Sequence, residues 1–170
     1  MNWLANLAHK RTPWVLLALI AFTFEVIALF FQYQMGLEPC IMCIYQRTAM
    51  LGLLIAGVIG AINPKNMIMR ITALSTWAVA SIWGFLLARE HIDMQTTTDP
   101  FAFSCEFEPN FPLPLHEWIP HFFAATGDCG NIDWQFLGLS MPAWMEVIFA
   151  AFTMVFFAVI FSRLLIKKSL

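Results

Sequence analysis

Charge is what this sequence has least of. Asp, Glu, Lys and Arg make up 12% of its 170 residues, whereas 60% of the residues are hydrophobic. A soluble domain carries about 25% charged residues, and polar groups could not cover so much apolar surface in water. The composition therefore argues against a soluble globular domain and for a protein surrounded by lipid. Repeats and low-complexity tracts are absent too, so residues 1–170 are expected to form a single membrane domain.

Apolar residues gather in four runs that are long enough to cross a bilayer. A hydrocarbon core about 30 Å thick needs about 20 residues of helix. The runs predict spans over residues 14–33, 41–62, 71–87 and 143–166. The first run is longer than the apolar part of a usual signal peptide and no small-x-small cleavage site follows it, so we expect a retained helix. The predicted fold class is an all-α integral membrane protein, a four-transmembrane-helix bundle.

Basic residues are missing from one long segment, residues 90–141, which holds eight acidic residues and no Lys or Arg. The four predicted spans place this segment on one side of the membrane. Seven of the nine basic residues fall on the other side: Lys10, Arg11, Lys65, Arg70, Arg163, Lys167 and Lys168. Because Lys and Arg favour the cytoplasmic side, both termini are predicted to be cytoplasmic and the acidic loop to lie outside.

Four cysteines are present, Cys40, Cys43, Cys105 and Cys129, and the predicted topology places all of them on the outer side. In an oxidising compartment this suggests two disulfides, for which three connectivities exist. Proximity in sequence favours Cys40–Cys43, which leaves Cys105 to pair with Cys129. The wide spacing of the second pair is a poor match to zinc ribbons, so no metal site is predicted.

The first cysteine pair forms a Cys-x-x-Cys motif at the start of the second span, directly after Pro39. Pro suits the first turn of a helix, where free N–H groups carry partial positive charge. That field stabilises a thiolate, which is the reactive form of cysteine. A structural clasp is the alternative, but closing so short a loop removes little chain entropy. The motif therefore favours redox exchange between Cys40 and Cys43.

Arg47 follows Cys43 by four residues, so the two side chains share one helix face. One interpretation is that Arg47 extends to the outer headgroups of the lipid. The other is that its charge stabilises a thiolate or the negative charge of a reduced cofactor. A cation inside a span is costly, and its place on the outer side runs against the positive-inside bias, which favours the second interpretation.

The outer loop carries the second cysteine pair among many turn-forming residues. A disulfide closing about 25 residues could stabilise the fold by about 3 kcal/mol, whereas an exposed disulfide is open to attack by a thiolate. The loop sequence leaves both roles open. Within the loop, residues 115–125 are expected to form a short helix. Its aromatic residues suit the membrane interface, and a lid packed over the helix bundle explains them equally well; the two roles are compatible.

Two further polar residues are candidates for function. Glu25 lies in the middle of the first span, where an ionisable residue suggests a functional site, although a protonated role between helices explains it equally well. His91 follows the third span on the outer side and could donate a hydrogen bond or a proton. No pair of histidines faces across the spans, which argues against axial haem ligation.

Four short sequence motifs are distinctive when taken together: PCIMCIYQR at residues 39–47, NPK at 63–65, GDC at 127–129 and WQFLGL at 134–139. Together they resemble the DsbB family of bacterial inner-membrane proteins over nearly the whole chain. The resemblance implies a protein that reoxidises the periplasmic dithiol oxidase DsbA and passes the electrons to a membrane quinone, either ubiquinone or menaquinone. The implied partners are DsbA, quinone and membrane lipid, and no nucleic acid. The acidic loop at residues 90–141 would then be periplasmic.

The resemblance also implies roles for individual residues. Cys105 and Cys129 would form the disulfide that reduced DsbA attacks, with Cys105 forming the mixed disulfide. Cys40 and Cys43 would reoxidise that pair, and Cys43 would engage the quinone. Arg47 would polarise the quinone ring, with His91 near it. Gln46 stands where family members carry an acidic residue, so no proton role is carried over to it.

Two other classes of protein remain as alternatives. A structural tetraspan protein with two stabilising disulfides predicts that Cys40 and Cys43 are inert to thiols and that Lys can replace Arg47. A membrane metal or haem protein that uses the cysteines and His91 predicts a bound metal or a haem spectrum.

Overall fold

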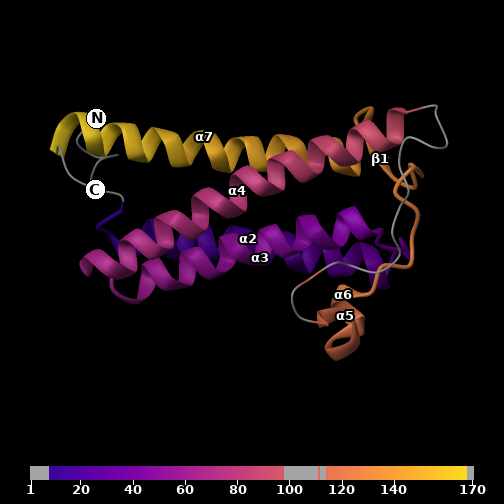
Figure 1. Cartoon of the computed structure of the whole chain (residues 1–170), viewed down its shortest axis with the longest axis horizontal. Helices are drawn as coiled ribbons and strands as arrows, with labels where there is room; N and C mark the ends of the chain where they lie inside the picture. Colours follow the sequence, from indigo (N-terminus) through magenta and orange to yellow (C-terminus); the bar gives the residue numbers. More distant parts are fainter. Residues whose placement is uncertain (1–7, 98–110, 112–113, 168–170) are drawn as a thin grey trace.

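The computed structural model describes residues 8–97, 111 and 114–167 of the chain. Four long helices run side by side along the molecule (Figure 1): α2 (Arg11–Tyr33), α3 (Ile41–Ile62), α4 (Met67–Thr96) and α7 (Met141–Lys167). Each is long and apolar enough to cross a membrane. The predicted all-α membrane bundle of four helices is therefore confirmed.

The remaining elements are short and lie between α4 and α7 in the chain. Two single-turn helices come first, α5 (Leu115–Trp118) and α6 (Pro120–Phe123). A two-stranded antiparallel ribbon follows, made of β1 (Gln135–Phe136) and β2 (Leu139–Ser140). At the turn of this ribbon Leu137 and Gly138 both have positive φ, 53° and 80°, which suits the twist of a tight hairpin. The ribbon leads directly into α7.

The long helices pack in the order α2, α3, α4, α7, each against its neighbours in that series. Their core contains a row of large aromatic side chains from three helices. The ring centroids of Trp14 and Trp77 are 5.9 Å apart, and those of Trp77 and Phe156 are 5.7 Å apart, both edge to face. This geometry is the favoured one for aromatic pairs. The row joins α2, α4 and α7 in the half of the bundle away from Cys40.

Small residues let α2 and α3 approach closely, as is common between membrane helices. A Cβ atom added to Gly57 would lie 2.6 Å from the backbone nitrogen of Ala18. Backbone atoms cannot move aside as the end of a flexible side chain can. We therefore expect Gly57→Val to push the helices apart and to destabilise the protein by about 1–3 kcal/mol, the usual cost of overpacking.

Thermal unfolding in detergent would measure this effect of Gly57→Val. The control is Val58→Leu on the neighbouring position, where the native side chain is 47% exposed and a larger side chain meets lipid or detergent. Equal melting temperatures for the two variants would contradict the close packing of α2 against α3.

Helix α4 extends beyond the predicted span of residues 71–87 at both ends. It begins early because the side chain of Asn66 caps it, its Oδ1 accepting from the amides of Ile68 and Met69 at 2.9 and 3.3 Å. It continues to Thr96 through a polar stretch that a search for apolar runs does not register. Residues 90–96, which were predicted to open the outer loop, are therefore helical, and this extension places His91 on a helix.

The helix predicted over residues 115–125 is broken into two turns. Pro120 has no N–H to donate and cannot continue the first turn, but it suits the start of the second. Two hydrogen bonds hold helix α6 against α2. The carbonyl oxygen of His121 accepts from the Tyr33 hydroxyl at 2.6 Å and from Gln32 Nε2 at 3.3 Å. These contacts bring the segment around Phe122 to the end of the bundle where α3 begins.

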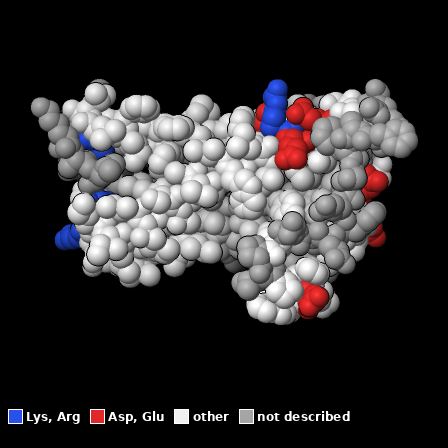
Figure 2. All heavy atoms as spheres, in the orientation of Figure 1, with Lys and Arg blue, Asp and Glu red and all other residues white. Residues whose placement is uncertain are grey.

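The two ends of the bundle differ in charge. Asp and Glu gather at one end in Figure 2, while Lys and Arg lie mainly at the other. We name the first the cysteine end, because α3 begins there after Cys40, and the second the basic end, which holds the turn between α3 and α4 with Lys65. The chemistry that the sequence predicts is therefore concentrated at the acidic end.

Candidate active site

The Cys-x-x-Cys pair forms the first turn of α3. Cys40 has an extended backbone and caps the helix, its Sγ accepting from the amide of Cys43 at 3.3 Å. The two Sγ atoms are 2.9 Å apart, and both cysteines are free thiols. Cys40 is buried, whereas Cys43 is partly exposed. The start of the helix thus holds the two sulfurs close enough for a disulfide to form between them with little movement.

The surroundings of Cys40 favour the protonated form of its thiol. The hydrogen bond from its thiol to Cys43 and its burial together raise the pKa of Cys40 above the ordinary cysteine value, and the amide of Cys43 opposes this only in part. Protonated thiol is a poor nucleophile. At Cys40 the hydrogen bond between the two sulfurs acts against the field of the helix start, which by itself favours a thiolate.

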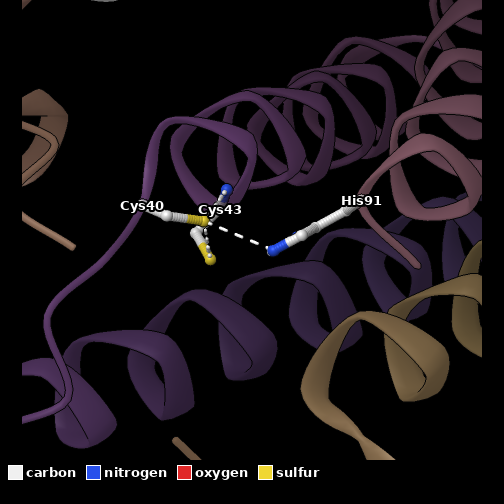
Figure 3. Close-up of side chains that lie close together, drawn as sticks. All are labelled: Cys40, Cys43 and His91. Atoms are coloured by element: carbon white, nitrogen blue, oxygen red, sulfur yellow. Dashed lines mark hydrogen bonds between the residues drawn. The ribbon is translucent and has the colours of Figure 1, made fainter. Parts of the chain in front are cut away.

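His91 approaches the pair from α4 (Figure 3). Its Nε2 lies 3.5 Å from the Sγ of Cys40, and its Nδ1 lies 3.2 Å from Nε2 of Gln46. An amide nitrogen only donates, so Gln46 donates to Nδ1 and the proton of a neutral His91 sits on Nε2, facing the sulfur. His91 is 2% exposed. In this form His91 is placed to donate a hydrogen bond from Nε2 to the Cys40 sulfur.

Arg47 lies one turn below Cys43 on α3 and is buried, with 6% of its surface exposed. Its Nη1 donates to Oε1 of Gln32 at 3.0 Å and to the carbonyl oxygen of Phe122 at 2.9 Å. The guanidinium carbon also lies 4.9 Å from the centre of the Phe122 ring, within the range of a cation–π contact. Arg47 is therefore anchored inside the protein. This disagrees with the interpretation that its side chain extends to the lipid headgroups.

A cavity of about 510 Å³ opens beside these residues, between α2, α3 and α7 at the cysteine end. Its wall is mostly apolar and aromatic, with Phe31, Trp134 and Trp144 among its members. The polar groups of the wall come from all sides: Glu25, Gln32, Glu38, Cys43, Gln46, Arg47 and His91. An apolar cavity with a few convergent polar groups is typical of a small-molecule site.

A second, smaller cavity of about 50 Å³ adjoins the first. Cys43 and His91 line both cavities, whereas Cys40 lines only the smaller one. The smaller cavity is also lined by Asp128 and Asp133. Both cysteines thus border the smaller cavity, and of the two Cys43 also borders the large one.

Cys129 packs against the same pair. It is 2% exposed and belongs to one cluster of buried residues with Cys40, Ile41, Met42 and Leu87. Hydrogen bonds from the amides of Thr126 and Gly127 to the carbonyl oxygen of Pro39, at 3.0 and 3.1 Å, hold this segment in place. Cys129 is disulfide-bonded, and Cys105, the other residue predicted to act with it, lies outside the described residues.

The structure brings together Cys40, Cys43, Arg47, His91 and Cys129 from α3, α4 and the loop. Sequence reasoning did not identify Gln32, which holds Arg47, or Gln46 as the partner of His91. It also left out the aromatic wall of the cavity. A signal for Gln32 was present, because it follows Glu25 by seven residues and so shares its helix face.

Fold and site together define a multi-pass membrane protein with a dithiol at the edge of an apolar cavity. The sequence model of the family described as "Disulfide bond formation protein DsbB" matches residues 10–159. The chain is 71% identical, over the full length of both proteins, to the Disulfide bond formation protein B of Pseudoalteromonas translucida, and 50% identical over the full length to that of Pseudoalteromonas atlantica. It is 48% identical to the protein of the same name from Psychromonas ingrahamii, covering 97% of this chain and 90% of that one. The chain belongs to the DsbB family.

This membership confirms the resemblance and gives the chain an oxidoreductase role in disulfide bond formation. Quinones are the general kind of cofactor that the family uses.

Proposed function

We propose that this protein accepts electrons from a reduced periplasmic dithiol oxidase, DsbA, and delivers them to a quinone of the bacterial inner membrane. The observation that carries the proposal is the placing of Cys43 and Arg47 on the wall of one apolar cavity of about 510 Å³. Cysteine supplies electrons, arginine supplies a fixed positive charge, and the cavity supplies room for a lipid-soluble acceptor. The redox site would face the periplasm, as the acidic cysteine end suggests.

The residues of the cavity fit a quinone ring. Its wall offers flat aromatic surfaces, and Arg47 offers N–H donors that could face a ring oxygen. A bound quinone would supply an acceptor for two electrons and two protons. Arg47 would hold that ring in place and stabilise negative charge that develops on its oxygen, since a preorganised cation is most effective in a site without water.

The four cysteines would act in two pairs. Reduced DsbA would attack the disulfide of Cys105 and Cys129, with Cys105 forming the mixed disulfide. Cys40 would then pass the oxidation to the loop pair, which its packing in one cluster with Cys129 supports. Cys43 would face the electron acceptor, which its position on the large cavity supports. His91 would donate a hydrogen bond from Nε2 to the Cys40 sulfur and stabilise its thiolate, as the 3.5 Å distance allows.

A membrane-embedded electron acceptor also explains how DsbA, a strong oxidant, can be reoxidised. DsbA is a strong oxidant, so an ordinary protein disulfide would reoxidise it poorly. A membrane-soluble acceptor of higher potential removes the electrons, which accounts for a redox site built inside a bundle of membrane helices.

One observation favours a second candidate function, metal binding. The ligand atoms of Cys40, Cys43 and His91 all lie within 4.8 Å of one another. Structural zinc sites have four protein ligands, and the described residues supply three. Metal analysis of the purified protein decides between the two functions: one equivalent of bound zinc that blocks thiol alkylation would favour the metal site.

A turnover assay tests the proposed function directly. Purified protein in detergent is mixed with reduced DsbA and a soluble quinone analogue, and the loss of quinone absorbance is followed together with the oxidation of DsbA. We expect many quinones reduced per protein, one for each DsbA oxidised. No quinone reduction by well-folded protein would overturn the proposal and leave the disulfides as structural braces.

A further inference from the structure

Glu25 is buried in the middle of α2 with 5% of its surface exposed. Neither carboxyl oxygen has a hydrogen-bond partner among the described residues. The side chain lines the large cavity, together with Ala28 and Gln32 from the same helix face. An unpartnered polar group in a membrane helix is costly. A polar group of a bound molecule in the cavity would remove that cost.

Arg47 is the obvious partner for Glu25, yet the structure does not pair them. The Nη1 of Arg47 is occupied by Gln32 and by the carbonyl oxygen of Phe122. The described residues form one ion pair, between Arg89 and Glu146, and it involves neither Glu25 nor Arg47. An isolated carboxylate is strongly disfavoured away from water. Glu25 therefore suits the form of a neutral acid, which has a proton to donate.

We propose that Glu25 is a proton donor of the large cavity: it holds a proton at the wall and gives it to an oxygen of the bound quinone while the Cys40–Cys43 dithiol is oxidised. This inference rests on the proposed function. It assigns the acid and the cation of the cavity to separate helices, with Glu25 on α2 supplying a proton and Arg47 on α3 supplying charge.

The reaction balances without another reactant. When Cys40 and Cys43 form their disulfide, the two thiols release two electrons and two protons. Reduction of a quinone to a hydroquinone takes up two electrons and two protons. Glu25 gives its proton to one oxygen and regains one of the two protons released by the dithiol, so it ends as the acid again. The second proton of the dithiol goes to the other oxygen of the quinone. His91, which lines both cavities, lies on the way from Cys40 to the large cavity.

The test separates binding from proton transfer. Glu25→Gln keeps a hydrogen-bond donor of the same shape but has no acidic proton. We expect this variant to bind a quinone analogue as tightly as the wild type and to reduce it about 10²-fold more slowly in a single turnover of the reduced Cys40–Cys43 pair, the scale of a lost general acid. Glu25→Asp, which keeps an acid, is expected to recover much of the rate.

Glu146→Gln is the matched control, because Glu146 lies on a membrane helix but outside the cavity wall. It is expected to reduce the analogue at the wild-type rate. Infrared difference spectra provide a readout independent of activity: binding of the analogue should shift a band of a protonated carboxyl group, and that band should be missing in Glu25→Gln and present in Glu146→Gln.

The outcomes separate this inference from the proposed function. If the wild type reduces the quinone analogue and Glu25→Gln does so equally fast, the inference is wrong and the proposed function stands. If the wild type reduces no quinone, the proposed function itself fails. Should Glu25→Gln not fold, Glu25→Asp decides: no movement of its carboxyl band on binding would overturn the inference.

Discussion

Cys43→Ala is expected to abolish quinone reduction. Without the Cys43 sulfur, Cys40 has no partner 2.9 Å away with which to form a disulfide, and a single thiol cannot supply two electrons by this route. The substitution removes one sulfur atom from a partly exposed position, so the fold should survive. The measurement is the rate of loss of quinone absorbance with reduced DsbA, which should fall to the level seen without protein.

The same variant separates the two cysteine pairs. If they act in series, Cys43→Ala still oxidises about one equivalent of reduced DsbA through the disulfide of the loop, and then stops. Cys105→Ala should oxidise none, because it lacks the sulfur with which DsbA would form a mixed disulfide. Continued quinone reduction by Cys43→Ala at the wild-type rate would refute the proposed relay.

Much of the fold could be predicted from sequence because lipid imposes a simple requirement. A helix must be apolar over about 20 residues to cross the hydrocarbon core, and this pattern is visible without any tertiary information. The apolar pattern does not reveal a helix that continues through polar residues. Residues 90–96 are polar, so the apolar pattern ends before them, although helix α4 continues to Thr96.

The site was predictable where its chemistry lies in neighbouring residues and not where it lies between helices. Cys40, Cys43 and Arg47 lie within eight residues, and their shared helix face follows from the helical repeat. The bond between Gln32 and Arg47 joins α2 to α3, and the contact between Gln46 and His91 joins α3 to α4. Such pairs depend on helix packing, which the apolar pattern leaves undetermined. The cavity depends on it as well.

Arg47 is a charged side chain buried inside the bundle, with 6% of its surface exposed. A charge removed from water is costly unless hydrogen bonds and an opposite charge compensate it. Arg47 has two hydrogen bonds and a contact with an aromatic ring, but no ion pair with any residue that the structure describes. A side chain that serves stability alone would be better apolar at this position. We infer that its charge is kept for a negative charge that exists only during turnover.

Arg47→Met is therefore expected to lower the rate of quinone reduction by about 10²–10³-fold, the scale on which removal of one preorganised electrostatic group acts. Among the described residues of the cavity wall, Arg47 is the one Lys or Arg, so no described neighbour replaces its charge. Methionine keeps an unbranched stem of similar length. Exchange between DsbA and the loop disulfide should be unchanged, because it does not involve the cavity.

Two further variants separate the effect of the Arg47 charge from that of its shape and position. Arg89→Met removes a charge of the same kind from the exposed pair with Glu146, and it should leave the rate unchanged. Arg47→Lys keeps the charge but loses the planar fork that bonds Gln32 and Phe122, and its rate should fall between those of Arg47→Met and the wild type. A fully active Arg47→Lys would show that a positive charge at this position suffices without the planar guanidinium. An equal loss in Arg47→Lys and Arg47→Met would show that the position of the guanidinium matters more than its charge.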